Sequence, residues 1–123
     1  MQRRSHKETR IPQPIATFIR AVNEHDADAF LSSFTNDAVV TDVGREFRGV
    51  AAIKEWGDRE IFDVNVTLDV IGVAERDGQT VVTVKVDGIF DKTGLPDPLL
   101  LNHHFTLNGG KIGAFSSRLA GEE

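Results

Sequence analysis

The apolar residues of this chain change their spacing once, near Val64, and that change limits the possible folds more than any other feature. Before it, apolar side chains recur at i, i+3, i+4 and i+7, which predicts an amphipathic helix. The first such stripe is Ile15, Phe18, Ile19 and Val22. After it, apolar and polar residues alternate as in a half-buried strand, beginning with Val64, Val66, Leu68 and Val70. Helices followed by strands predict an α+β fold.

The first half of the chain is expected to form helices. Pro12 and Pro14 introduce the first one, because a missing amide hydrogen does little harm at a helix start. Asp26 is the expected N-cap of a second, shorter helix, which carries Ala29, Phe30 and Phe34. A third helix is expected from residue 50 to about residue 62, bent or ended by Gly57. Its inner side is expected to carry Val50, Ile53 and Trp56, with Glu60 or Ile61 in the last turn.

The second half is expected to form strands joined by turns. The pair Asp77–Gly78 is a strong signal for a two-residue hairpin. Strands are expected at about residues 64–71, 80–90, 99–107 and 111–119, with a loop at 91–98. These elements predict one curved antiparallel sheet with the helices on a single face. We expect one domain over residues 12–120, preceded by a flexible leader at residues 1–11.

Composition excludes several classes of function. The chain has 123 residues, no cysteine and a formal net charge of −5. The negative charge argues against nucleic acid as a partner, because phosphate binding needs a basic surface. The lack of cysteine excludes disulfides, thiolate catalysis and thiolate metal sites. No apolar run reaches the length of a membrane span, and the N-terminus lacks the apolar core of a secretory signal. We therefore expect a cytoplasmic protein without membrane contact.

The segment Ala38–Gly44 poses the main functional question. It is expected to form a short strand in which Ala38, Val40 and Asp42 share one face. A carboxylate on such an apolar face has two interpretations. Asp42 either caps the following turn or pairs with Arg45 or Arg48, or it is a tuned acid or base in a pocket.

The chain resembles a known superfamily in the order and spacing of four short segments. These are Phe34–Ala38, Asp42 itself, Gly49–Ile53 and Gly110–Ile112. Together they are similar to the nuclear-transport-factor-2-like (NTF2-like) superfamily, in its SnoaL-like, polyketide-cyclase-like and ketosteroid-isomerase-like branch, over roughly residues 15–119. The resemblance implies a cone, also described as a cystatin-like α+β barrel, whose curved sheet and N-terminal helices enclose an apolar pocket. It also implies a homodimer formed through the outer face of the sheet.

The resemblance implies a role for Asp42, which falls where the isomerase branch keeps its proton-shuttling aspartate. The tyrosine that supports this aspartate in the isomerases is replaced here by Phe18, and the chain contains no tyrosine. Their second oxyanion-binding acid falls near His103. These departures argue against true ketosteroid isomerase activity. Cavity or core aromatics are expected to include the candidate substrate-binding residues Phe18, Phe30, Phe34, Phe47, Trp56 and Phe105.

His103 and His104 are adjacent on a predicted strand and must face opposite sides. His103 shares its face with Leu101 and Phe105, which we assign to the pocket, whereas His104 is expected to meet solvent or a dimer partner. A buried histidine is often only a hydrogen-bonded core residue, and this alternative stays open for His103. Because the two side chains diverge and no other histidine spacing suits a metal, no metal site is expected. No phosphate-binding glycine-rich loop is present either.

These observations lead to two hypotheses. In the first, the chain binds an apolar cyclic or polyketide-like molecule and acts without a cofactor as an isomerase, cyclase or dehydratase. Asp42 is then the base and His103 its partner, because environment can push the pKa values of two such groups apart. In the second, the chain is a non-catalytic module that carries a ligand or forms dimers.

Overall fold

The computed structural model describes residues 10–121 and contains four helical segments. They are α1 (Gln13–Glu24), α2 (Ala27–Ser32), α3 (Gly49–Gly57) and η2 (Asp58–Phe62), a π-helical turn that continues α3. The expected leader at residues 1–11 lies, except for its last two residues, outside the described part of the chain. No helix in residues 10–121 is both long enough and apolar enough to cross a membrane.

The helices begin close to where the sequence predicts, but the second one is shorter than predicted. Helix α2 ends at Ser32, and Phe34, which the sequence placed on this helix, is the first residue of β1. Pro12 precedes α1, and His25 ends it in the left-handed conformation with φ of 59°. Asp26 then caps α2, because its side chain accepts a hydrogen bond from the Ala29 amide across 3.1 Å. Helix α3 ends at Gly57, as expected.

Six strands form one curved, open sheet. They are β1 (Phe34–Asp42), β2 (Arg45–Arg48), β3 (Thr67–Arg76), β4 (Gln79–Asp87), β5 (Leu100–Asn108) and β6 (Lys111–Leu119). Their order across the sheet is β2-β1-β6-β5-β4-β3. All neighbouring strands pair antiparallel except β1 and β6, which pair in parallel. The sheet is therefore mixed, whereas the sequence predicted an antiparallel one.

Several strand boundaries differ from the predicted ones. Strand β1 begins at Phe34 rather than Ala38, because the Ser33 carbonyl already accepts a hydrogen bond from Ile112 of β6. Strand β4 ends at Asp87 instead of continuing to Phe90. There the Ile89 amide donates instead to the Val64 carbonyl across 2.7 Å. The Asp77–Gly78 hairpin has positive φ at both residues, as its turn type requires.

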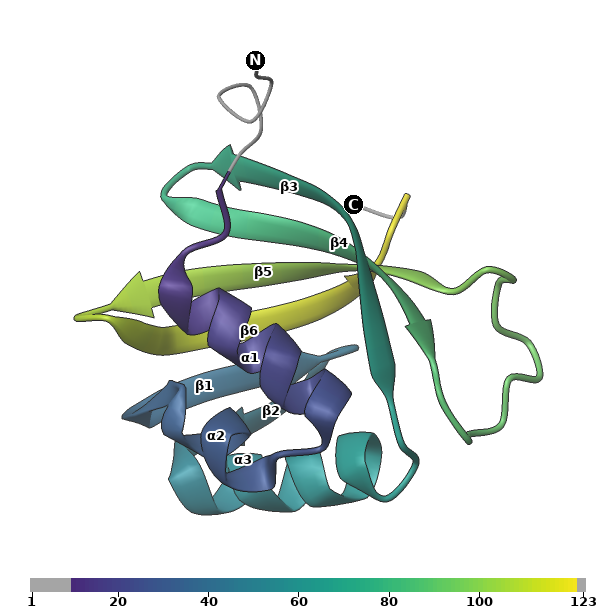
Figure 1. The fold of residues 1–123 in the computed structure, drawn as a ribbon, viewed down its shortest axis with the longest axis horizontal. Coiled ribbons are helices and arrows are strands. Elements are labelled where there is room, and N and C mark those ends of the chain that lie inside the picture. Colours follow the sequence, from purple (N-terminus) through teal and green to yellow (C-terminus); the bar gives the residue numbers. More distant parts are fainter. Residues whose placement is uncertain (1–9, 122–123) are drawn as a thin grey trace.

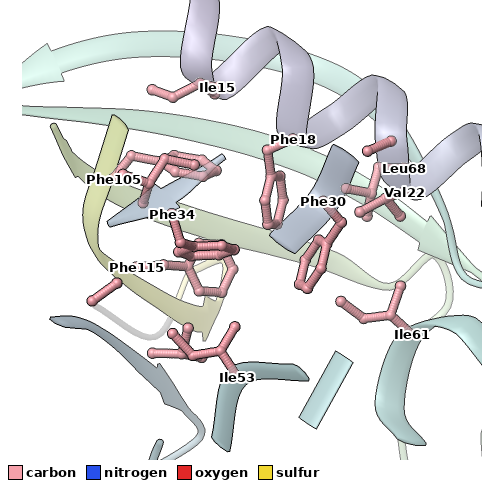
Figure 2. Packing of buried hydrophobic residues seen from close by; sticks show 14 of the residues in the cluster. Ile15, Phe18, Val22, Phe30, Phe34, Ile53, Ile61, Leu68, Phe105 and Phe115 are labelled. Atoms are coloured by element: carbon pink, nitrogen blue, oxygen red, sulfur yellow. The ribbon is translucent and has the colours of Figure 1, made fainter. Parts of the chain in front are cut away.

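The helices pack against the concave face of the sheet, where α1 crosses the strands and α3 lies beside β1 (Figure 1). Phenylalanine rings from helices and strands meet in this layer. Figure 2 shows Phe18 of α1 pointing toward Phe115 of β6, and their ring centroids lie 5.3 Å apart. Phe18, Phe30, Phe34, Phe105 and Phe115 are all 2% exposed or less. This aromatic core fixes α1 over the sheet and leaves one end of the concave face open.

Candidate functional site

A cavity of about 850 Å³ occupies that open end. Most of its wall is apolar and comes from α1, the strands and the loop before β5, including Val22, Val66, Leu68, Phe90, Leu99 and Leu101. One part of the wall is polar and carries Asp42, Arg45, Arg59, Glu60, His103 and Ser117. A volume of this size is typical of small-molecule sites. The uneven wall suits a molecule with an apolar body and a polar edge.

Asp42 reaches the cavity because β1 alternates its faces. Ala38 and Val40 on the same face are fully buried, and Asp42 is the last residue of the strand, where the buried layer gives way to the cavity. Its Oδ2 accepts two hydrogen bonds, one from Trp56 Nε1 at 3.1 Å and one from Arg45 Nη2 at 2.9 Å. None of the hydrogen bonds formed within residues 10–121 uses Oδ1.

Arg45 connects Asp42 to a second carboxylate. Its guanidinium lies 3.3 Å from Glu60 Oε1, and hydrogen bonding to Glu60, together with the charges of both carboxylates, raises the pKa of Arg45. The Arg45 side chain is 51% exposed, whereas that of Asp42 is only 18% exposed. The pairing with Arg45 that the sequence left open as an alternative is therefore present. It does not exclude a site role, since Asp42 also lines the cavity.

His103 also lines the cavity, on the face of β5 predicted for it. The residue is 5% exposed, and its ring packs edge-on against Phe115 at a centroid distance of 4.8 Å. Burial, with a smaller contribution from the charge of His104, lowers the pKa of His103 to about 3. Its Nδ1 is buried without a hydrogen-bond partner in the described structure. His103 is thus a neutral imidazole at physiological pH.

Strand register places Asp42 and His103 in one row across the inner face of the sheet. Asp42 of β1 pairs with Ser117 of β6, and Ser117 pairs with His103 of β5. Two strand spacings put the Cα atoms of Asp42 and His103 roughly 10 Å apart. Ser117 lies between them, is 5% exposed and lines the same cavity.

The predicted substrate-binding aromatics fall into two groups. Phe18 and Trp56 line the cavity. Phe30, Phe34 and Phe105 lie in the core and not among the cavity-lining residues. Phe47 packs on Trp56 at a centroid distance of 6.1 Å and is likewise outside the cavity wall. Apolar periodicity identified buried aromatics but did not separate those that face the cavity from those behind it.

His104 lies on the predicted outer face, opposite to His103, but it is only 8% exposed. Of the two surroundings expected for it, solvent is therefore wrong, and contact with a dimer partner stays a prediction. On that face its register partners are Val81 and Ser116. Val81 is itself 5% exposed, so the central part of the outer face is well covered.

Sequence reasoning missed most of the polar residues of the cavity wall, among them Arg59, Glu60, Ser116, Ser117 and Arg118. The sequence predicts Glu60 only as a possible inner residue of the third helix, and it predicts no role for Arg59. Both reach the cavity because the chain widens into the π-helical turn η2 after Gly57. No cluster of three or more histidine, aspartate or glutamate side chains that could hold a metal occurs in residues 10–121.

Comparison with known proteins identifies the family of this chain. Residues 15–114 match the SnoaL-like domain, and the chain therefore belongs to the SnoaL-like family. The mixed α+β architecture with a curved, open sheet is that of the NTF2-like fold. No curated protein matches the sequence.

Solved structures agree with this assignment. A "putative polyketide cyclase" from Sinorhizobium meliloti is 26% identical, with a TM-score of 0.78 over 88% of this chain and 95% of that one. A second protein of that description, from Xanthomonas campestris pv. campestris, is 24% identical, with a TM-score of 0.70 over 85% of each chain. A Mycobacterium tuberculosis protein in complex with estradiol-17β-hemisuccinate is 14% identical, with a TM-score of 0.73 over 89% of this chain and 92% of that one. At identities of 24% and 14%, the likeness to the last two structures shows a shared fold.

Proposed function

We propose that this protein binds an apolar cyclic ketone or a polyketide-like molecule in the cavity and catalyses proton transfer next to its carbonyl group. Such a step underlies isomerisation, aldol-type cyclisation and dehydration, and none of these needs a cofactor. The observation that carries the proposal is the row of Asp42 and His103 on one wall of one cavity. The ligands named for similar folds, estradiol-17β-hemisuccinate and polyporic acid, support a cyclic ligand.

The two residues have different roles in the proposed reaction. Asp42 uses Oδ1 to take a proton from the carbon next to the carbonyl, and the resulting enolate carries its negative charge on oxygen. Trp56 and Arg45 hold Oδ2 and so fix the direction of the carboxylate. His103 stays neutral and donates the N–H of its imidazole to the enolate oxygen. A hydrogen-bond donor held in this place stabilises the negative charge that develops on that oxygen.

A non-catalytic role is the second candidate, and two contacts of Asp42 favour it. Arg45 and Trp56 both donate to Oδ2 of Asp42, so this carboxylate already connects the end of β1 to α3 and β2, as a purely structural residue would. In this role the same cavity binds and carries an apolar molecule. Assembly into a dimer through the outer face of the sheet and a cytoplasmic location stay predictions under both candidates.

Deuterium exchange into 2-tetralone tests the first candidate directly, because this small bicyclic ketone has acidic hydrogens beside its carbonyl. The protein is expected to accelerate the exchange of these hydrogens in D₂O, followed by mass spectrometry. The substitution Asp42→Asn should lower the exchange rate by about 10²- to 10⁴-fold, the usual contribution of a general base. Binding of 2-tetralone, followed by fluorescence of the single tryptophan Trp56 in the cavity wall, should persist.

The matched control is Asp37→Asn on the same strand. Asp37 is exposed, interacts with Thr35 and lies outside the cavity wall, so its loss should leave exchange unchanged. Exchange that is equally fast in Asp42→Asn and in the unmodified protein would exclude Asp42 as the base. Binding of 2-tetralone without any acceleration would favour the ligand-carrying role.

A further inference from the structure

Ser117 is one of the polar residues of the cavity wall that the proposed mechanism leaves without a role. It occupies the position between Asp42 and His103 in the row across β1, β6 and β5. The residue is 5% exposed and lines the cavity. None of the side-chain hydrogen bonds formed by residues 10–121 reaches its hydroxyl, although its backbone carbonyl accepts one from Val43. The neighbouring His103 Nδ1 is buried without a partner in the described structure, so two polar groups of this row have hydrogen-bonding capacity that a molecule in the cavity can use.

The spacing of the residues in this row indicates which part of a bound molecule lies next to Ser117. Directly paired residues on neighbouring strands lie about 5 Å apart, so Ser117 and His103 can both reach a single oxygen atom. The proton taken by Asp42 lies on the carbon beside that carbonyl, a short distance further along the row. In a ketone placed in this way, the carbon next to the carbonyl lies over Asp42 and the carbonyl oxygen lies over Ser117 and His103.

We propose that Ser117 is a substrate-binding residue whose hydroxyl, together with the neutral imidazole of His103, donates hydrogen bonds to the carbonyl oxygen of an enolisable cyclic ketone. The pair forms a two-donor site for the oxygen on which negative charge develops when Asp42 takes the neighbouring proton. This inference rests on the proposed function and adds Ser117 to it as a second hydrogen-bond donor to the substrate oxygen.

The test uses 2-naphthol, a stable aromatic analogue of the enol of 2-tetralone, and 2-methylnaphthalene, in which a methyl group replaces the hydroxyl. The dissociation constant of each is measured by titration calorimetry with the full-length protein. Ser117→Ala should weaken 2-naphthol binding by about 3- to 10-fold, the effect of one neutral hydrogen bond. Binding of 2-methylnaphthalene should not change, because its methyl group forms no hydrogen bond with Ser117. A purely structural effect of the substitution would instead weaken the binding of both probes alike.

Ser32→Ala is the matched control, since Ser32 at the end of α2 is exposed, donates its hydroxyl to the Ala29 carbonyl of the same helix and lies outside the cavity wall. It should bind both probes as the unmodified protein does. Ser117→Cys keeps the size of the side chain and loses most of its donor strength, so it should repeat the effect if Ser117→Ala does not fold.

The outcomes separate this inference from the proposed function. Equal changes for the two probes, or no change in either, would overturn the role of Ser117 while leaving an Asp42-dependent exchange of 2-tetralone intact. A protein that binds none of these bicyclic molecules would overturn both proposals.

Discussion

Trp56 donates its indole N–H to Oδ2 of Asp42 across 3.1 Å, and this bond connects α3 to the end of β1. Trp56 is 4% exposed, and its ring also packs on Phe30, Phe47 and Phe115. The same carboxylate oxygen accepts from Arg45. The direction of Asp42 therefore depends on a helix residue 14 positions further along the chain and on Arg45, which is three positions away across the β1–β2 turn.

The substitution Trp56→Phe tests how much this bond contributes. It keeps an aromatic ring in the core but leaves Oδ2 with Arg45 as its remaining described donor. A hydrogen bond to a charged group contributes about 1.5–3 kcal/mol, so the free energy of unfolding should fall by about 1 to 3 kcal/mol in urea titrations. Asp42→Asn should cost less, because an amide oxygen can still accept from the indole. A larger loss in Asp42→Asn than in Trp56→Phe would contradict this account.

His103 should make the stability of the protein depend on pH. Its pKa is about 3 in the folded protein and about 6.5 in an unfolded chain. Between these values the unfolded chain binds a proton that the folded protein excludes, so stability falls as the pH falls. The loss should approach about 1.4 kcal/mol per pH unit below pH 6. Urea titrations at pH 7 and pH 4.5 measure it.

The substitution His103→Phe isolates this contribution. A phenylalanine ring suits the surrounding rings of Phe18, Phe105 and Phe115 and leaves no unpaired nitrogen in the core. The variant should lose about 3 kcal/mol less than the unmodified protein between pH 7 and pH 4.5. Equal losses in the two proteins would mean that His103 is not the group that titrates.

The sequence predicted the fold well because each of its signals is local. The change of spacing near Val64 separates helices from strands. Asp26 caps the helix that begins at the next residue, and Asp77–Gly78 closes a hairpin. Alternation also placed Asp42 and His103 on the inner faces of their strands. The parallel pairing of β1 with β6 could not be predicted in this way, because the two strands are far apart in the sequence and no turn connects them directly.

Ser117 shows where local alternation fails. Ile112 and Phe115 are both buried although three positions separate them, because a bulge shifts the pairing of β6 with β5. Counting by twos from Ile112 would therefore place Ser117 on the outer face. The site also depends on the register between β1 and β6, which no segment of the sequence encodes alone.

Gly57 should be intolerant of a side chain for a reason that the sequence does not show. A Cβ atom at this position would lie 2.7 Å from Cε2 of Phe30, a buried ring. Helix propensity by itself favours alanine here by up to about 1 kcal/mol, but the overlap should dominate, and Gly57→Ala should lower the free energy of unfolding by about 1–3 kcal/mol. Gly72→Ala in β3 is the control, since nothing lies within 4 Å of its added Cβ, and its effect should stay within about 0.5 kcal/mol.

Asn23 fastens the end of α1 to the edge strand β3 by two hydrogen bonds with one residue. Its Nδ2 donates to the Leu68 carbonyl at 2.9 Å, and its Oδ1 accepts from the Leu68 amide at 2.7 Å. Leu68 and Val22, the residue before Asn23, both line the cavity, so these bonds also hold two of its walls together.

The substitution Asn23→Asp keeps the acceptor and replaces the donor by a second carboxylate oxygen facing the Leu68 carbonyl. It should lower the free energy of unfolding by about 1–3 kcal/mol, the cost of a lost hydrogen bond and an unpaired carbonyl. Hydrogen exchange should show faster exchange of the β3 amides near Leu68, with those of β5 and β6 unaffected. The control is Gln13→Glu at the other end of α1, where Gln13 is exposed and contacts only Thr17 of its own helix. A uniform increase across the whole sheet would mean that Asn23 supports global stability and does not fasten α1 to β3 locally.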